Sequence, residues 1–178
     1  HYLYDGVEDK DKEVIVTSGT FGAVIPYTAD PASSFAGRNY VLERIEKPSS
    51  GIITTSISRN IVNIYYTLDE NGPEGKEDGI PDKYQVTFTY QSEAGAHGTV
   101  TGTTSEVKTI REIQKDAEGI ITSVGAVTPA NPAQPSTISA DTGYHFDKWT
   151  DESGNEYKDD AALKEAGFAV DKTFTAHF

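Results

Sequence analysis

The chain has 178 residues and a formal net charge of −13, from 28 acidic and 15 basic residues. A surface this acidic repels nucleic acid and anionic lipid, so neither is expected as a partner. There is no cysteine, which excludes disulfides, iron–sulfur clusters, thiolate zinc sites and cysteine nucleophiles. No run of about 20 apolar residues occurs, so membrane insertion is not expected. Since Met is also absent, even at position 1, we interpret the chain as a processed product or an excised piece.

The first 68 residues contain four segments that alternate apolar and polar side chains or are rich in β-branched residues. Both patterns are typical of strands that bury one face. In the first of these strands Tyr2 and Tyr4 share a face, because side chains alternate with a period of two. Gly and Pro residues separate the segments, and a long Pro/Ser-rich excursion covers residues 23–37. The predicted strands are 1–4, 13–17, 40–45 and 60–68.

Residues 84–178 form a second series of strand patterns, which begins and ends with alternating aromatic residues. Near its end, Ala161 to Ala166 predicts a short helix, which Asp159 or Asp160 caps and Gly167 ends. The predicted strands are 84–90, 120–127, 144–150 and 172–178, with a Thr/Gly/Val-rich stretch of weak alternation at 97–110 and an extended Pro-rich loop at 129–135.

The two series share one order, in which a Tyr-containing strand opens the segment and an aromatic strand closes it. Between them, Gly and Pro residues disfavour regular structure in an acidic joint. We therefore predict a first β module at 1–68, an acidic Gly/Pro linker at 69–83 and a second β module at 84–178. The predicted fold class is mainly β or small α+β, with two tandem modules in an elongated arrangement.

Short motifs in both segments resemble known repeat families. The first segment contains Tyr2-Leu3-Tyr4-Asp5-Gly6, Gly19-Thr20-Phe21-Gly22 and the stretch from Asn60 to Tyr66, and it resembles MucBP (mucin-binding-protein) repeats. The second contains Val86-Thr87-Phe88, the stretch from Gly143 to Trp149 and the stretch from Phe174 to Phe178, and it resembles internalin-type B repeats. The resemblance implies two β-grasp-like modules from a cell-wall-attached, extracellular surface protein or adhesin of a Gram-positive bacterium.

The acidic joint is the strongest candidate for a metal site. Hard cations such as calcium prefer several oxygen ligands within a turn-forming loop. The joint offers them from Asp69, Asn71, Glu74, Asp78 and Asp82. The alternative is a solvated linker that its acids keep extended, and it is favoured because the ligand order of an EF-hand is broken. The four His residues are far apart in the sequence and predict no metal site of their own.

The remaining acidic pairs do not predict an enzyme. The carboxylates at 151–152 and 159–160 lie at an expected turn and helix start, where Asp caps backbone N–H groups. The sequence has no nucleophile elbow and no Gly-rich phosphate loop. We therefore predict no catalytic activity, and no cofactor besides the candidate calcium. An intramolecular Lys–Asn isopeptide bond, with Lys148 or Lys172 as the amine, is a further hypothesis whose partners the sequence does not identify.

Exposed aromatic rings bind sugars by stacking, and the candidate glycan ligands are Tyr65, Tyr27 and Trp149. Tyr65 is the best surface candidate, because its neighbours in the strand point to the opposite face. For Trp149 a role in the core is the favoured alternative, since a lone Trp in a small β module usually anchors its core. Its expected core partners are Phe146, Tyr144, Phe88 and Phe174.

These observations lead to one functional hypothesis and two alternatives. The hypothesis is a non-enzymatic, extracellular piece of a bacterial surface adhesin that serves as stalk, spacer or adhesion module. The alternatives are a glycan- or mucin-binding module that uses exposed aromatic residues, and an accessory domain of a carbohydrate-active enzyme. The expected partners are host mucin, a glycan or another surface protein, and the piece is expected to be a monomer within a longer chain.

Overall fold

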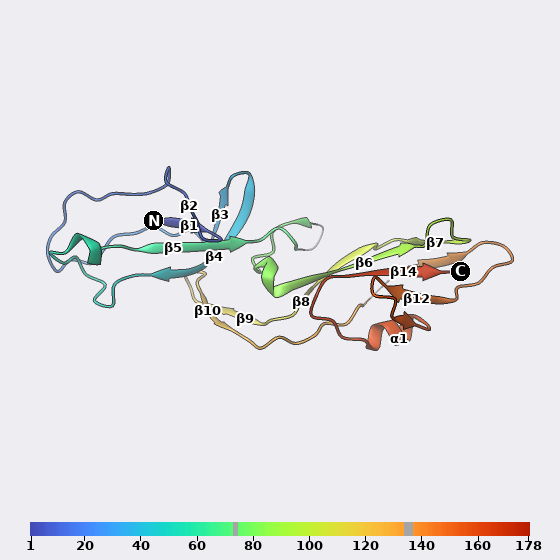
Figure 1. The fold of residues 1–178 in the computed structure, drawn as a ribbon. Coiled ribbons are helices and arrows are strands. Elements are labelled where there is room, and N and C mark those ends of the chain that lie inside the picture. The colour runs from blue at the N-terminus through green and yellow to red at the C-terminus, as the bar shows by residue number, and fades with distance from the viewer. Residues whose placement is uncertain (73–74, 134–136) are drawn as a thin grey trace. The chain divides into compact units, whose positions relative to one another are not determined.

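The computed structural model describes residues 1–72, 75–133 and 137–178 (Figure 1). The fold is mainly β, with 39% of residues in strands and 8% in helices, as the sequence predicted. The chain divides into two compact units, of which the first holds residues 1–83 and 113–125 and the second holds 84–112 and 126–178. No helix within the described ranges is both long enough and apolar enough to cross a membrane.

The main sheet of the first unit has five strands in the order β2-β1-β5-β4-β3. The central strands β1 and β5 run parallel, and every other neighbouring pair in this sheet is antiparallel (Figure 1). In the described part of the chain, a short 3-10 helix follows β4 and another follows β5. The bounds are β1 (Tyr2–Tyr4), β2 (Val7–Glu8), β3 (Ala32–Phe35), β4 (Arg38–Glu46), β5 (Asn63–Leu68), η1 (Ile57–Arg59) and η3 (Asp82–Tyr84).

Three of the four strands predicted in this unit are present, and one prediction is wrong. The strands β1, β4 and β5 correspond to the predicted strands 1–4, 40–45 and 60–68. The predicted strand 13–17 is not formed, and its apolar residues Val14, Ile15 and Val16 are 58–74% exposed. β-branched residues favour a strand only where a neighbouring strand supplies hydrogen bonds and a surface to pack on. In the described structure this segment pairs with no strand.

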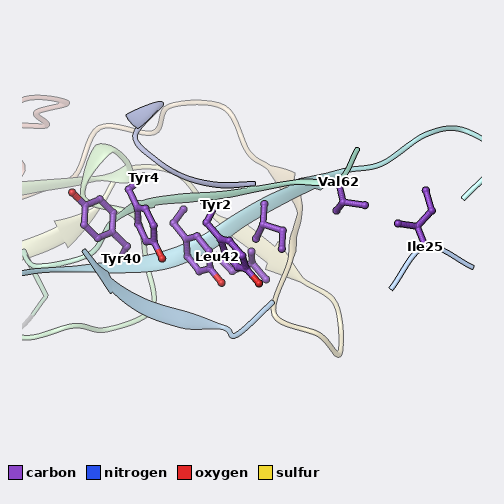
Figure 2. Close-up of a cluster of buried hydrophobic side chains, with 8 residues drawn as sticks. Tyr2, Tyr4, Ile25, Tyr40, Leu42 and Val62 are labelled. Atoms are coloured by element: carbon purple, nitrogen blue, oxygen red, sulfur yellow. The ribbon is translucent and has the colours of Figure 1, made fainter. Parts of the chain in front are cut away.

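Tyrosine rings make up much of the first unit's core. Tyr2 and Tyr4 are both buried, which confirms that they share the inward face of β1. The ring of Tyr4 stacks on Tyr66 at 5.0 Å and on Phe35 at 4.7 Å, measured between centroids. Figure 2 shows the rings of Tyr2, Tyr4 and Tyr40 gathered beside Leu42, with Val62 and Ile25 at one end of the cluster.

Backbone carbonyls of the excursion at 23–37 accept hydrogen bonds from the hydroxyls of two of these buried rings. Tyr2 donates to the carbonyl of Thr28 at 2.9 Å, and Tyr66 donates to the carbonyl of Asp30 at 3.0 Å. Burial, with a smaller contribution from Tyr4, raises the pKa of Tyr66 to about 12. A buried hydroxyl without a partner costs about 1–3 kcal/mol, and the hydrogen bonds to the excursion avoid this cost.

A hairpin from the middle of the chain also belongs to the first unit. It consists of β9 (Ile113–Lys115) and β10 (Ile121–Val124), which pair antiparallel. Ile120 packs against the first core, and at Gly119 an added Cβ would lie 3.2 Å from Pro31. The sequence analysis placed these residues in the second module and placed 69–83 in a linker, whereas the contacts group both with the first unit.

The second unit has a five-stranded main sheet and a separate two-stranded pair. The sheet order is β13-β12-β14-β6-β8, and β7 pairs with β11. The central strands β6 and β14 run parallel, and the other pairings are antiparallel (Figure 1). The bounds are β6 (Gln85–Ser92), β7 (Gly98–Thr101), β8 (Ser105–Thr109), β11 (Thr137–Ala140), β12 (Lys148–Asp151), β13 (Glu156–Tyr157), β14 (Lys172–His177) and α1 (Asp160–Glu165).

The second core is built from phenylalanine rings around Trp149. The burial of Trp149 with Phe88, Phe146 and Phe174 confirms most of the predicted cluster. The prediction for Tyr144 is wrong, because its ring is 48% exposed and stacks on the ring of His97 at 3.8 Å. The strand predicted at 144–150 begins only at residue 148, so Tyr144 precedes the alternation that would have turned it inward.

The predicted helix is present as α1, and it covers the second core. Asp159 is its N-cap, with a side chain that accepts a hydrogen bond from the Ala162 N–H at 2.8 Å. Asp160 accepts a hydrogen bond at 2.8 Å from the indole N–H of Trp149, and Leu163 inserts into the core. The two acidic residues therefore have separate structural roles, one as cap and one as partner of the buried indole.

Candidate functional site

The acidic residues of the 69–82 segment close a loop through backbone hydrogen bonds. The buried Asp69 accepts from the N–H groups of Asp78 at 3.1 Å and Gly79 at 2.9 Å, one at each carboxylate oxygen. Asp82 accepts from the N–H groups of residues 70 and 71 at 2.8 and 2.9 Å through a single oxygen. Asn71 is exposed, and Glu74 lies outside the described residues. Asp78 accepts from the N–H group of residue 80 at 2.9 Å, so three of the five candidate calcium ligands bind the backbone of the loop itself.

A lysine that the sequence analysis missed lies at this loop. Lys115, from β9, donates to the carbonyl of Gly79 at 2.5 Å. Burial lowers the pKa of this lysine, while the charges of Asp69 and Asp78 partly oppose that shift. Burial also raises the pKa of Asp69, and the neighbouring Asp78 and Asp82 add to the effect. Lys115 therefore places a positive charge where the charges of Asp69 and Asp78 act on it.

The three candidate glycan ligands lie in different surroundings. The indole of Trp149 has no exposed surface, so it presents no face to a sugar in this structure. One face of the half-buried Tyr65 ring is covered by the guanidinium of Arg44, 3.7 Å from the centroid, and its hydroxyl donates to Glu46 at 2.8 Å. Tyr27 is 42% exposed, and the Lys47 ammonium lies 5.7 Å from the centroid of its ring.

A groove of about 660 Å³ lies in the first unit between the end of β4 and the start of β5. Its lining includes Lys47, Arg59, Ser49, Ser50, Ser58 and Asn63. The lining carboxylate, Glu46, accepts hydrogen bonds from Tyr65 and Arg44, and these hydrogen bonds lower its pKa. Among the described residues no carboxylate pairs with Lys47 or Arg59. In a chain of net charge −13, this groove is a locally cationic surface with hydroxyls beside it.

A second group of potential metal ligands lies at the first hairpin. Glu8, which lies opposite Leu3 in the β1–β2 pair, contacts the imidazole of His1, and a Glu13 oxygen lies 3.6 Å from the same ring nitrogen. One ligand atom from each residue falls within 4.8 Å of the other two, a spacing at which three groups can share one ion. The sequence analysis missed this group because it searched for two histidines at metal-site spacing. The imidazole Nδ1 of His1 lies within hydrogen-bond distance of the Glu8 carboxylate.

The turn that follows β12 contains a buried ion pair. Asp151 accepts hydrogen bonds from the N–H groups of Ser153 and Asn155, each at 2.9 Å, and its second oxygen lies 3.0 Å from the Lys172 ammonium. Burial alone would raise the pKa of Asp151, but the hydrogen bonds from Asn155 and Lys172 outweigh it, and the pKa lies well below its ordinary value. This lysine also pairs with Glu152 at 2.9 Å.

The two lysines considered for an isopeptide bond thus differ in their surroundings. Lys172 pairs with the buried Asp151 and the exposed Glu152, whereas Lys148 pairs with Glu156 at the surface. Both amines are held as ammonium groups, since hydrogen bonds to carboxylates raise the pKa of each one. An ammonium beside a carboxylate forms an ion pair, because a charged amine has no lone pair with which to attack a carbonyl. The arrangement therefore favours a structural ion pair.

Comparisons with protein-family models, curated proteins and solved structures found no match for this chain. The fold and the groups described above are therefore the basis for a functional proposal.

We predict that calcium leaves the stability of the native chain unchanged. The oxygens of Asp69 and Asp82 already accept backbone hydrogen bonds, and Lys115 supplies a positive charge at the same loop. The measurement is the melting temperature with and without millimolar calcium. The matched variant is Lys115→Gln, which keeps a donor for the Gly79 carbonyl and removes the charge. A calcium-dependent rise in the native protein would contradict the prediction, and a rise only in Lys115→Gln would identify Lys115 as the competing cation.

We predict that Asp151→Ala lowers the free energy of unfolding of the second unit by about 3–5 kcal/mol, because Lys172 then loses its buried partner. Since the pKa of Asp151 is depressed in the folded state, its contribution is complete above the unfolded pKa of about 4 and declines as the pH falls below it. Denaturant unfolding between pH 7 and pH 3 measures both effects. The exposed Asp147→Ala is the control. If the stability of the two variants falls equally as the pH is lowered, Asp151 is not the source of the acid sensitivity.

Proposed function

We propose that the chain is a non-enzymatic piece of an extracellular, cell-wall-attached bacterial adhesin, in which the two β units serve as spacers of a stalk. One observation carries the proposal: in each unit the first and last strands of the main sheet are parallel neighbours. Parallel strands point the same way, so the chain enters such a sheet at one end and leaves it at the other. A unit with this topology adds its own length to the distance that the chain spans.

The motifs that resemble known repeats support the same proposal. The opening motif Tyr2 to Gly6 contains β1, and the closing stretch from Asn60 to Tyr66 runs into β5. In the second unit, Val86 to Phe88 lies in β6, and most of the stretch from Phe174 to Phe178 lies in β14. The opening and closing motifs of the MucBP-like and internalin-like resemblance therefore contain residues of the parallel pairs, whereas Gly19 to Gly22 and the stretch from Gly143 to Trp149 lie outside them. In each sheet this pair is flanked on both sides by antiparallel strands, an arrangement that suits a β-grasp-like module.

The proposal contains no catalytic step, because the carboxylates that suggested an enzymatic alternative have structural partners. Asp159 caps α1, Asp160 holds the indole of Trp149, and Asp151 organises a turn and pairs with Lys172.

A second candidate function is glycan binding, and the cationic groove favours it. Lys47 and Arg59 offer charge to a carboxylate or sulfate, and the neighbouring Ser hydroxyls offer hydrogen bonds to sugar hydroxyls. Tyr27, beside Lys47, supplies an exposed ring on which a sugar can stack. The candidate ligand is therefore an acidic saccharide, such as those that host mucins carry, and not a neutral one.

The spacer proposal predicts the distance between the entrance and the exit of the second unit. Ser92 lies opposite Ala176, so the start of β6 and the end of β14 are separated by the 8 residues of β6, or ~26 Å. Since the chain has no native cysteine, spin labels attach only where cysteines are introduced. A label pair at Lys83→Cys and after Phe178, each two residues outside these strand ends, should give a narrow distribution at a distance above this value. The control pair at Ala94→Cys and after Phe178 should lie much closer, and equal distances would contradict the proposal.

A glycan array separates the spacer function from glycan binding. We expect no glycan to be retained by the native chain if its units are only spacers. Retention of acidic saccharides that is lost in the double variant Lys47→Ala, Arg59→Ala would replace the spacer role with the binding role. Lys10→Ala, an exposed lysine outside the groove, is the matched control for loss of charge.

A further inference from the structure

We propose that the parallel strand pair at the centre of each unit is a mechanical clamp that resists tension along the chain. This inference rests on the proposed stalk function and adds a specific property to it, the direction in which each unit bears load. It follows from the strand register, the position of the pair in its sheet and the aromatic contacts across it.

The direction of load follows from the topology. When the second unit is stretched from its ends, β6 is pulled from its N-terminal end and β14 from its C-terminal end. Because the two strands are parallel neighbours, this force slides them past each other and loads every hydrogen bond of the ladder together. A force applied to both strands at the same end would instead break the bonds one after another.

The clamp of the second unit is the longer one. Five residue pairs join β14 to β6, from Lys172 opposite Phe88 to Ala176 opposite Ser92. Two further hydrogen bonds extend it at its ends, from the Glu93 N–H to the Ala176 carbonyl at 3.1 Å and from the Thr87 N–H to the Asp171 carboxylate at 2.8 Å.

Side chains reinforce this ladder. The ring of Phe174 stacks on that of its opposite residue, Tyr90, at 5.7 Å, and both are buried. Sliding by one residue would separate these rings and turn each side chain to the wrong face of the sheet. The strands therefore have no neighbouring register into which they could slip at low cost.

The clamp of the first unit is shorter. Three pairs join β1 to β5, with Tyr2, Leu3 and Tyr4 opposite residues 64, 65 and 66. Two hydrogen bonds extend this ladder, from the Ile64 N–H to the His1 carbonyl and from the Asp5 N–H to the Tyr66 carbonyl, both at 2.9 Å. Tyr4 stacks on Tyr66, its opposite residue, as Phe174 does on Tyr90. With fewer bonds loaded together, the first unit should yield at a lower force than the second.

Single-molecule pulling along two directions tests the clamp in the intact chain, because introduced cysteines are its only thiols. For the second unit, handles at Lys83→Cys and after Phe178 shear the pair, whereas handles at Ala94→Cys and after Phe178 peel it apart. For the first unit, handles at the N-terminus and Asn71→Cys shear the pair, whereas handles at the N-terminus and Ser58→Cys peel it. All four introduced sites are exposed, and denaturant unfolding checks that the variants are equally stable.

We expect the force of unfolding to be several-fold higher in shear than in peeling for each unit. When the whole chain is stretched from its ends, two events are expected. Phe174→Leu should lower the force of the stronger event, and Tyr4→Leu that of the weaker event. Equal unfolding forces in the two directions would overturn the clamp. A first unit that unfolds at a higher force than the second would overturn the role of ladder length. The spin-label distances are independent of these forces, so the clamp can fail while the spacer proposal stands.

Discussion

The parallel pairing of the first and last strands is the constraint on which each unit depends. Two parallel strands cannot be joined by a tight turn, so the chain between them must travel back across the sheet before it returns. In the first unit the residues between β1 and β5 supply strands to both sides of the pair, and in the second unit the residues between β6 and β14 do the same. The parallel pair therefore lies in the middle of each sheet, with strands on both sides. These flanking strands form hydrogen bonds with the backbone groups that face outward from the pair.

What covers the buried face of each sheet explains which aromatic residues form its core. In the first unit an irregular excursion covers the sheet, and its carbonyls at Thr28 and Asp30 are free of strand pairing and accept hydrogen bonds from tyrosine hydroxyls. In the second unit α1 covers the core and contributes Leu163 to it. Phenylalanine fits beneath such a cover without an unsatisfied hydroxyl. The exception, Tyr90, donates to Glu106, a side chain on the neighbouring strand β8.

The sequence predicted the strands well where alternation coincided with burial, and poorly where only residue type suggested a strand. Tyr2 and Tyr4, or Phe174 and Ala176, alternate because one face of their strand meets a core. Val14 to Val16 have the composition of a strand, but composition does not reveal whether a partner strand is available. The candidate sites show the same limit. The acids of the 69–82 loop are visible in the sequence, whereas their backbone donors and Lys115 become neighbours only through the fold.

The hairpin at 113–125 shows why sequence modules and physical units differ in this protein. A module is recognised from the order of its strands, and by that order the hairpin lies between β8 and β11 of the second unit. A unit is defined by the apolar surface that its residues bury together, and Ile120 buries its surface against the tyrosine core. At ~25 cal/mol per Å² of buried apolar surface, even a partly buried isoleucine contributes on the order of 1 kcal/mol, a noticeable share of a small core's stability. The first unit is therefore complete only with residues that the sequence assigns to the second, and its stability depends on a segment that lies about 50 residues beyond its last main strand.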